Sequence, residues 1–171
     1  MSLHICILCH EYPPERHGGI GANAQALGRA LVERGNAVTV IGVSRHTAGV
    51  EDDRGVTVMR MPHTRFRGLG FVVNGHRVRR ALAEVNRARP IDIVEAEEIG
   101  LAILPRRFPI TTVLRMNGGH QFFAVTLGES PRPWRSWLER RSFARADHLC
   151  AVTRFAAETT RELLRLGDRP I

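Results

Sequence analysis

Residues 3–42, LHICILCHEYPPERHGGIGANAQALGRALVERGNAVTVIG, contain the pattern that decides the fold. The first seven form a short apolar run, typical of a strand buried on both faces of a parallel sheet. A loop with two prolines follows, and then an amphipathic helix from about Gly21 to a C-terminal cap at Gly35. Residues 37–43 form a second apolar run. The stretch therefore predicts a strand, a crossover helix and a parallel strand.

The same alternation continues along the chain. Further strands are predicted at residues 56–61, 91–95, 110–115 and 148–152. Further helices are predicted at residues 71–89, 134–146 and 155–166, with a short helix or turn ending near Pro105. Thr153 is the expected N-cap of the last helix and Gly167 its expected C-terminal cap. This order predicts an α/β, Rossmann-like doubly wound fold, with a mostly parallel sheet and helices on both faces.

Composition and length exclude several classes of protein. The chain of 171 residues, 43% of them hydrophobic, fits a single domain over residues 1–171. All 25 basic residues are arginine, and the absence of lysine excludes a Schiff-base lysine and a Walker A loop. The net charge of +8 favours phosphates, anionic lipids or nucleic acid as partners, although a compositional bias toward arginine explains it equally well.

The N-terminus and the apolar runs bear on the cellular setting. The sequence begins without a basic leader and cleavage site, and its longest apolar run is far below the roughly 18 residues that span a bilayer. We therefore expect a cytoplasmic protein with reduced thiols. Cys6, Cys9 and His10 match the C-x-x-C-H pattern of haem attachment, but the motif lies in a predicted buried strand. We interpret both cysteines, and Cys150, as core residues.

The loop after the first strand brings three glycines to the start of the first helix. Glycines allow backbone N–H groups to approach an anion, and the helix N-terminus adds partial positive charge, so Gly18, Gly19 and Gly21 predict a phosphate or diphosphate site. A turn that only packs helix on strand is the alternative. Residues 19–24 also match the dinucleotide pattern G-x-G-x-x-A, with Arg45 available for a 2′-phosphate. About nine residues separate the strand from this glycine, which is too many for that fingerprint's tight turn.

Four segments together carry a resemblance to a known family. HEYPPERHGGIGANAQALGRALVERGNAVTVIG resembles the opening of the family 4 glycosyltransferases of the GT-B fold. Later in the chain, DIVEAEEIG resembles the family's fourth strand, TTVLRMNGG its fifth, and RADHLCAVTRF its Ala-Asp strand before a helix cap. The ordered set covers nearly the whole chain and is more specific than the glycine loop alone.

This resemblance implies the N-terminal, acceptor-side half of a two-domain enzyme. The family transfers a hexosyl group from a nucleoside diphosphate sugar to a hydroxyl acceptor with retention of configuration, and without a metal or other cofactor. Its C-terminal, nucleotide-sugar-binding domain is absent from this chain, so we expect the chain alone to be nearly inactive. The resemblance assigns the donor diphosphate to the backbone of Gly18, Gly19, Ile20 and Gly21.

The resemblance also suggests catalytic and acceptor-binding residues. The family has a histidine near the end of its fifth strand, where this chain has Asn117, so either Asn117 forms hydrogen bonds only or His120 takes the role. An exposed loop histidine is the alternative for His120. Glu98, with Glu95, is expected to bind acceptor hydroxyls, unless these acids only stabilise a helix N-terminus.

Two basic and apolar segments suggest a surface partner. The first contains Arg60, Arg65, Arg67, Arg77, Arg79, Arg80, Arg87 and Arg89, interleaved with Phe66, Leu69 and Phe71. It predicts peripheral contact with an anionic membrane, where a lipid-linked acceptor would lie, or else a solvated basic face. The second is the helix with Trp134 and Trp137, for which we expect domain packing. Nucleic-acid binding remains an alternative from the charge, although no recognition motif accompanies it.

Overall fold

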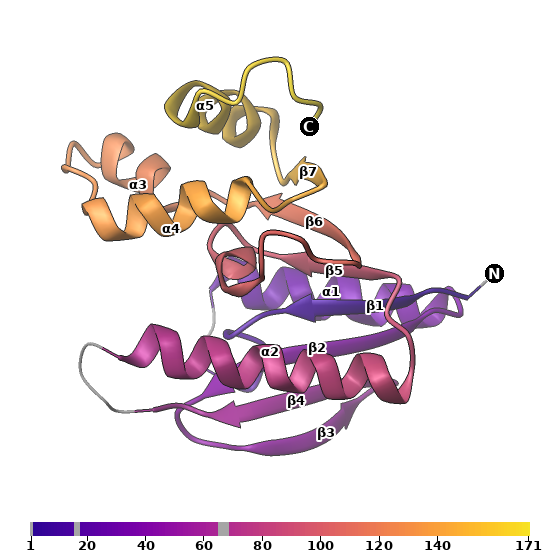
Figure 1. Cartoon of the computed structure of the whole chain (residues 1–171). Helices are drawn as coiled ribbons and strands as arrows, with labels where there is room; N and C mark the ends of the chain where they lie inside the picture. The colour runs from indigo at the N-terminus through magenta and orange to yellow at the C-terminus, as the bar shows by residue number, and fades with distance from the viewer. Residues whose placement is uncertain (1, 16–17, 65–68) are drawn as a thin grey trace. The chain divides into compact units, whose positions relative to one another are not determined.

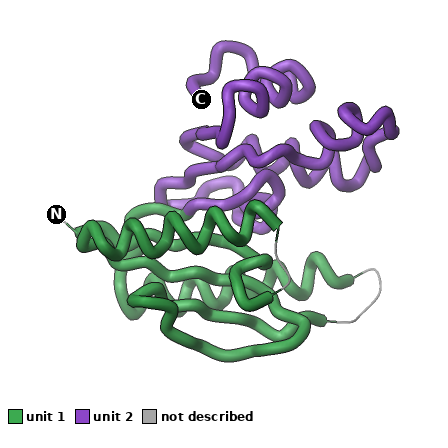
Figure 2. The backbone as a smooth tube through the Cα atoms, turned by 180° about the vertical axis from the view of Figure 1, so that it is seen from behind, with its two compact units in different colours: residues 1–94 green, residues 95–171 purple. Residues whose placement is uncertain are grey.

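We analysed a computed structural model of the chain, which describes residues 2–15, 18–64 and 69–171. The chain forms two compact units, residues 1–94 and 95–171 (Figure 2). Its seven strands make the mostly parallel sheet of an α/β fold. The strand order is β3-β4-β2-β1 in the first unit and β6-β7 in the second, and the division between the units falls within β5 (Ile93–Ala96). The predicted fold class is confirmed.

Within its described residues, the first unit contains four complete strands and two helices. They are β1 (His4–Leu8), α1 (Gly19–Glu33), β2 (Ala37–Ser44), β3 (Gly49–Asp53), β4 (Val56–Pro62) and α2 (Gly70–Ala88). β2 pairs in parallel with both β1 and β4, whereas β3 is antiparallel to β4. Both helices contact β2 and β4, and they cover opposite faces of these strands (Figure 1). The expected coverage of both faces is therefore present in this unit.

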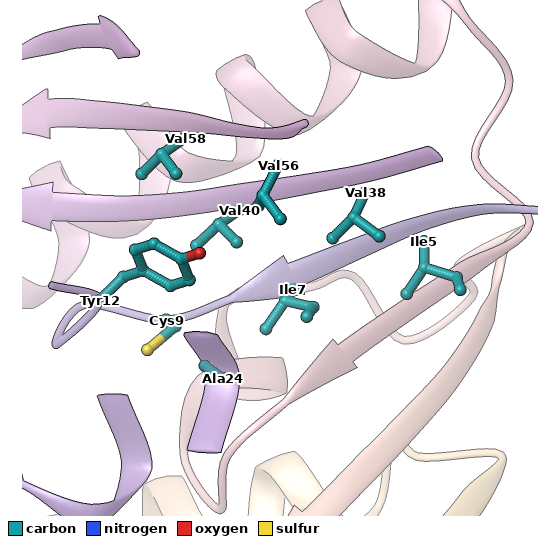
Figure 3. Packing of buried hydrophobic residues seen from close by; sticks show 9 residues of the cluster. All are labelled: Ile5, Ile7, Cys9, Tyr12, Ala24, Val38, Val40, Val56 and Val58. Carbon is teal, nitrogen blue, oxygen red and sulfur yellow. The ribbon is translucent and has the colours of Figure 1, made fainter. Parts of the chain in front are cut away.

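The core of the first unit follows from the alternation of side chains along its strands. Every second residue of β1, β2 and β4 faces α1, which packs on them with Ala24 and Leu27. The strand residues of this cluster are Ile5, Ile7, Val38, Val40, Val56 and Val58 (Figure 3). Cys9 belongs to the same cluster and Cys6 is fully buried, so both are core residues as expected.

The second unit contains the remaining elements. They are η1 (Gly100–Ile103), β6 (Thr111–Met116), α3 (His120–Thr126), α4 (Pro133–Phe143), β7 (His148–Ala151) and α5 (Arg154–Leu164). β6 and β7 pair in parallel, and α5 packs on both. α4 contacts η1 and α3. Thr153 caps α5 as predicted, because its hydroxyl accepts the Ala156 N–H at 3.0 Å.

Several sequence-based expectations need correction. β3 and α3 were not expected, because β3 is polar and exposed and α3 has only seven residues. α5 ends at Leu164, two residues before the expected limit, since Arg165 already adopts a left-handed conformation. Cys150 is half-buried rather than a core residue, because it lies in β7, at the edge of the sheet. No helix within the described ranges is long and apolar enough to cross a bilayer.

A network around Asp53 ties the loop after β1 to α1 and β3. The Asp53 carboxylate accepts hydrogen bonds from Tyr12 Oη at 2.7 Å, Gln25 Nε2 at 3.1 Å and the Arg29 guanidinium at 2.6 Å. The Tyr12 ring is buried in the core cluster (Figure 3). The hydrogen bonds, first of all those from Arg29, lower the pKa of Asp53 to about 2.

This network predicts a pH-dependent contribution to stability. Because the pKa of Asp53 is depressed on folding, its contribution is present above about pH 4 and disappears as the pH falls toward 2. We expect Asp53→Asn to lower the free energy of unfolding near neutral pH by about 1–3 kcal/mol, and the difference from the parent to shrink below about pH 4. Urea denaturation across this range measures it, with exposed Glu33→Gln as control. A difference independent of pH would contradict the prediction.

Candidate functional site

The glycine loop is positioned by the end of β1 and the start of α1. Gly18 is the N-cap of this 15-residue helix, with an extended backbone, and Gly19 is its first residue. Among the described residues, a Cβ atom built on Gly19 would meet no atom within 4 Å. The N–H groups of Gly19, Ile20 and Gly21 have no hydrogen-bond acceptor among the described residues. Gly19 is exposed and Ile20 is half-buried, whereas Gly21 is buried. The amides of Gly19 and Ile20 are therefore the ones accessible to an anion at the positive end of the helix dipole.

Gly18 itself differs from the sequence-based expectation. Its N–H donates to Oε2 of Glu11 at 3.1 Å, so this amide already has a partner within the loop. The Glu11 carboxylate thus accepts the hydrogen bond that the sequence analysis assigned to a phosphate oxygen. His17, which precedes Gly18, lies outside the described residues.

Buried polar contacts hold the proline loop in place. Arg60 is buried, although the sequence placed it on a basic surface, and its guanidinium donates to the carbonyls of Tyr12 at 3.3 Å and Pro13 at 2.5 Å. The same guanidinium forms an ion pair with Glu51. Glu15 accepts a hydrogen bond from the Ser44 hydroxyl at the end of β2, and this bond lowers the pKa of Glu15. The loop is thus anchored to β2, β3 and β4.

The spacing of these elements argues against a dinucleotide site. β1 ends at Leu8 and α1 begins at Gly19, so the intervening loop contains the whole proline segment. The dinucleotide fingerprint needs its first glycine in a tight turn directly after the strand, because the helix must start beside the strand end. Residues 19–24 instead lie inside α1.

In the second unit, a turn formed by residues 117–120 connects β6 to α3. Gly118 has a φ of +102°, a conformation that disfavours other residues, and Gly119 is the N-cap of α3. Glu98, which is buried, accepts the backbone N–H of Asn117. The amide of Asn117 donates from Nδ2 to the Arg115 carbonyl at 3.1 Å. The structure therefore brings the predicted residues Glu98 and Asn117 together.

A second buried carboxylate, Glu139 of α4, supports the same turn and was missed by sequence reasoning. Its Oε2 accepts from the backbone N–H of Gln121 at 3.2 Å and from Gln121 Nε2 at 2.9 Å. A Cβ on Gly119 would overlap Oε1 of Glu139 and would lie 3.0 Å from Cγ of Glu98. Burial raises the pKa of Glu98, and the nearby charge of Glu139 adds to this effect. The only sequence signal was an acid within an otherwise basic helix.

His120 and Glu95 have partners within the second unit. Nε2 of His120 accepts the backbone N–H of Arg132 at 2.8 Å, which places the proton of a neutral ring on Nδ1. The Glu95 carboxylate forms a two-point ion pair with the Arg115 guanidinium, with N···O distances of 2.7 and 3.1 Å. The predicted residues thus form two groups, the amides of residues 18–21 in the first unit and the acidic and polar side chains in the second. Within the described ranges, no three His, Cys, Asp or Glu side chains are grouped to hold a metal ion.

A mostly parallel sheet, with a long loop between β1 and a helix that begins on glycines, defines a Rossmann-like α/β domain. Within that class, the chain belongs to the glycosyl transferase 4-like domain family, whose model matches residues 18–170. The resemblance noted in the sequence is thereby confirmed. No curated protein sequence matches the chain significantly.

Solved glycosyltransferase structures share the fold. Sucrose-phosphate synthase from Thermosynechococcus elongatus matches with a TM-score of 0.81 and 11% identity, over 99% of this chain and 47% of that protein. A UGT transferase from Siraitia grosvenorii in complex with UDP matches with a TM-score of 0.61 and 10% identity, over 99% and 50%. LpCGTa in complex with UDP has a TM-score of 0.58 and 14% identity, over 100% and 50%. The chain therefore spans about half the length of these proteins.

Proposed function

We propose that this chain is the acceptor-side half of an enzyme that transfers a hexosyl group from a nucleoside diphosphate sugar to a hydroxyl acceptor, with retention of configuration. Membership of the glycosyl transferase 4-like family supports transfer of a sugar. Two similar structures are complexes with UDP, which supports a nucleoside diphosphate as the donor's leaving group. In this proposal a second domain supplies the remaining donor contacts, and neither a metal nor another cofactor takes part.

The observation that carries the proposal is the open start of α1. In the reaction, the bond between the anomeric carbon and the diphosphate oxygen breaks, and negative charge builds on the diphosphate. We assign stabilisation of this charge to the amides of Gly19 and Ile20, because they lie at the positive end of a 15-residue helix and no described residue would meet a Cβ on Gly19. Gly21, which the sequence also assigned to the donor, is buried and would contribute only through the helix dipole. Since the amide of Gly18 is bonded to Glu11, we assign that residue to fixing the loop rather than to binding the donor.

The second unit is proposed to receive the acceptor. His120 and Asn117 remain the two candidates for contact with the reacting sugar, His120 through its ring and Asn117 through its amide. The sequence assigned both Glu98 and Glu95 to the acceptor. We propose Glu95, paired with Arg115, as an acceptor ligand. Glu98 is buried and accepts the N–H of Asn117, so we propose that it acts on the acceptor only through the turn that it supports.

We further propose a cytoplasmic enzyme with peripheral contact to an anionic membrane. Within the described part of the basic stretch, Arg60 is buried, Arg77 donates to the Pro62 carbonyl and Arg80 pairs with Glu84. Arg79 and Arg87 of α2 are exposed. Arg65, Phe66 and Arg67, which the sequence analysis included, lie outside the described residues.

A charge introduced at Gly19 tests the donor site. We expect Gly19→Asp to lower the affinity for UDP at least tenfold, because a carboxylate would compete for the amides and repel the diphosphate. In a polypeptide with both halves of the enzyme, sugar transfer should fall about 10²- to 10³-fold. Gly70→Asp is the matched control, since Gly70 also begins a helix with open space around it.

Nuclear magnetic resonance titration of the chain follows the binding directly. UDP, but not uridine, should shift the amide signals of Gly19, Ile20 and Gly21, and Gly19→Asp should abolish these shifts. Equal effects of the Gly19 and Gly70 variants, or shifts confined to other amides, would contradict the proposed site.

A further inference from the structure

The exposed face of α4 combines two indole rings with positive charge. Trp134 and Trp137 are 55% and 60% exposed, and they lie three residues apart, on the same side of the helix. Other residues of the same helix, Leu138, Ser142 and Phe143, are buried. The two tryptophans are therefore not needed for packing of the second unit, although they are the only two in the chain.

The arginines around these rings have no acidic partners. Arg132 and Arg135 are exposed, and neither they nor Arg140 and Arg141 form an ion pair within the described ranges. The guanidinium carbons of Arg135 and Arg141 lie 5.3 and 5.5 Å from the ring centres of Trp134 and Trp137. The only other charged residue of α4 is Glu139, which is buried beneath this face. The exposed charged side chains of α4 and of its N-cap residue are thus all arginines.

We propose that this face of α4 is a docking surface for an anionic lipid bilayer. Tryptophan is favoured at the boundary between headgroups and acyl chains, because its ring is apolar while its indole N–H seeks an acceptor. Neither indole N–H has an acceptor within the described part of the chain, so both are free to bond lipid carbonyl or phosphate oxygens. The unpaired arginines match the negative charge of the leaflet, and the chain as a whole carries +8.

This surface goes beyond the sugar-transfer proposal and differs from the basic stretch of α2. It lies wholly within the second unit, whereas α2 belongs to the first. α3, which packs against α4, exposes the apolar side chains of Phe123 and Val125, and its C-cap residue Leu127 is also exposed. Binding at α4 would bring the turn at residues 117–120 close to the bilayer, because that turn leads directly into α3.

Tryptophan fluorescence tests the proposal directly, because both reporters lie on this face. With vesicles of phosphatidylcholine and phosphatidylglycerol near physiological ionic strength, we expect a blue-shifted emission and quenching by brominated acyl chains. Pure phosphatidylcholine should give a much weaker response. Arg132→Gln/Arg135→Gln should reduce partitioning about 25-fold, at about fivefold per charge. These two arginines suit the test because neither side chain donates a hydrogen bond within the described ranges.

The control is Arg34→Gln/Arg45→Gln, which removes the same charge from exposed positions outside both α4 and the basic stretch of α2. An equal loss in this control, or sedimentation with vesicles without any change in emission, would overturn the proposal. A blue shift that depends on protein concentration without lipid would instead identify a second copy as the occupant. A larger response to duplex DNA than to the anionic vesicles would favour nucleic acid. Loss of UDP binding in the Gly19 variant without loss of vesicle binding would separate the two proposals.

Discussion

Gly42→Ala is expected to destabilise the first unit by about 3 kcal/mol, because β1 and β2 approach each other too closely there for a side chain. A Cβ on Gly42 would overlap the carbonyl oxygen of Cys9 and would lie 3.1 Å from its carbonyl carbon. Both are backbone atoms, so no side-chain rotation relieves the overlap. The adjacent hydrogen bond, from the Cys9 N–H to the Ile41 carbonyl at 3.0 Å, would have to lengthen as the strands separate.

Urea denaturation of the parent chain and the variant measures this loss. Gly70→Ala is the matched control, because a Cβ at Gly70 would meet nothing within 4 Å and alanine favours the helix that begins there. We expect the control to be neutral or slightly stabilising. A Gly42→Ala variant as stable as the control would show that the two strands separate without cost. Because Cys9 leads into the proline loop, the Gly42 variant should also weaken any binding at the start of α1.

The fold was predictable because its central strands have clear apolar patterns. β1 and β2 are nearly continuous apolar runs, as burial on both faces requires, whereas β4 alternates buried and more exposed residues. All three lie within two residues of the predicted limits. β3 was missed because four of its five residues are exposed, and the segment carries three acids that mask its strand character. α3 was missed because seven residues are too few for an amphipathic pattern to emerge.

The candidate site was predictable only where it depends on local sequence. The glycines at the start of α1 are recognisable because the loop and the helix are neighbours in the chain. Arg60 and Glu139 were not recognisable, since their partners Tyr12 and Gln121 come from distant segments. An arginine in a basic stretch and a glutamate in a basic helix both resemble surface residues, and only tertiary contacts reveal that they are buried.

The two Gly-Gly pairs of the chain, Gly18-Gly19 and Gly118-Gly119, show the same limit of prediction from local sequence. Gly19 has no positive φ, and no described residue would meet a Cβ there. A glycine at this position therefore serves to leave the backbone amides at the start of α1 uncovered. Gly118 requires glycine for its backbone conformation, and Gly119 requires it because Glu139 occupies the place of a side chain. Sequence alone does not distinguish a glycine that admits a ligand from one that admits a neighbouring carboxylate.

Gly119→Ala is expected to destabilise the second unit by about 3 kcal/mol, because the new methyl group would displace the buried carboxylate of Glu139. That carboxylate would lose its hydrogen bonds from the backbone N–H and Nε2 of Gln121. Glu139→Ala should cost a similar amount, since it leaves both donors without an acceptor in a buried site. Glu139→Gln retains one acceptor oxygen and should cost less than half as much.

The double variant Gly119→Ala/Glu139→Ala isolates the interaction between the two positions. With the carboxylate removed, the methyl group at residue 119 would enter vacated space, so the double variant should be at least 1 kcal/mol more stable than the sum of the single effects predicts. Full relief is not expected, because Cγ of Glu98 would still lie 3.0 Å from the new Cβ. Chemical denaturation of the parent, the two single variants and the double variant completes this double-mutant cycle. Strictly additive losses would mean that Glu139 does not restrict residue 119, and that the turn carrying Asn117 and His120 is held by Glu98 alone.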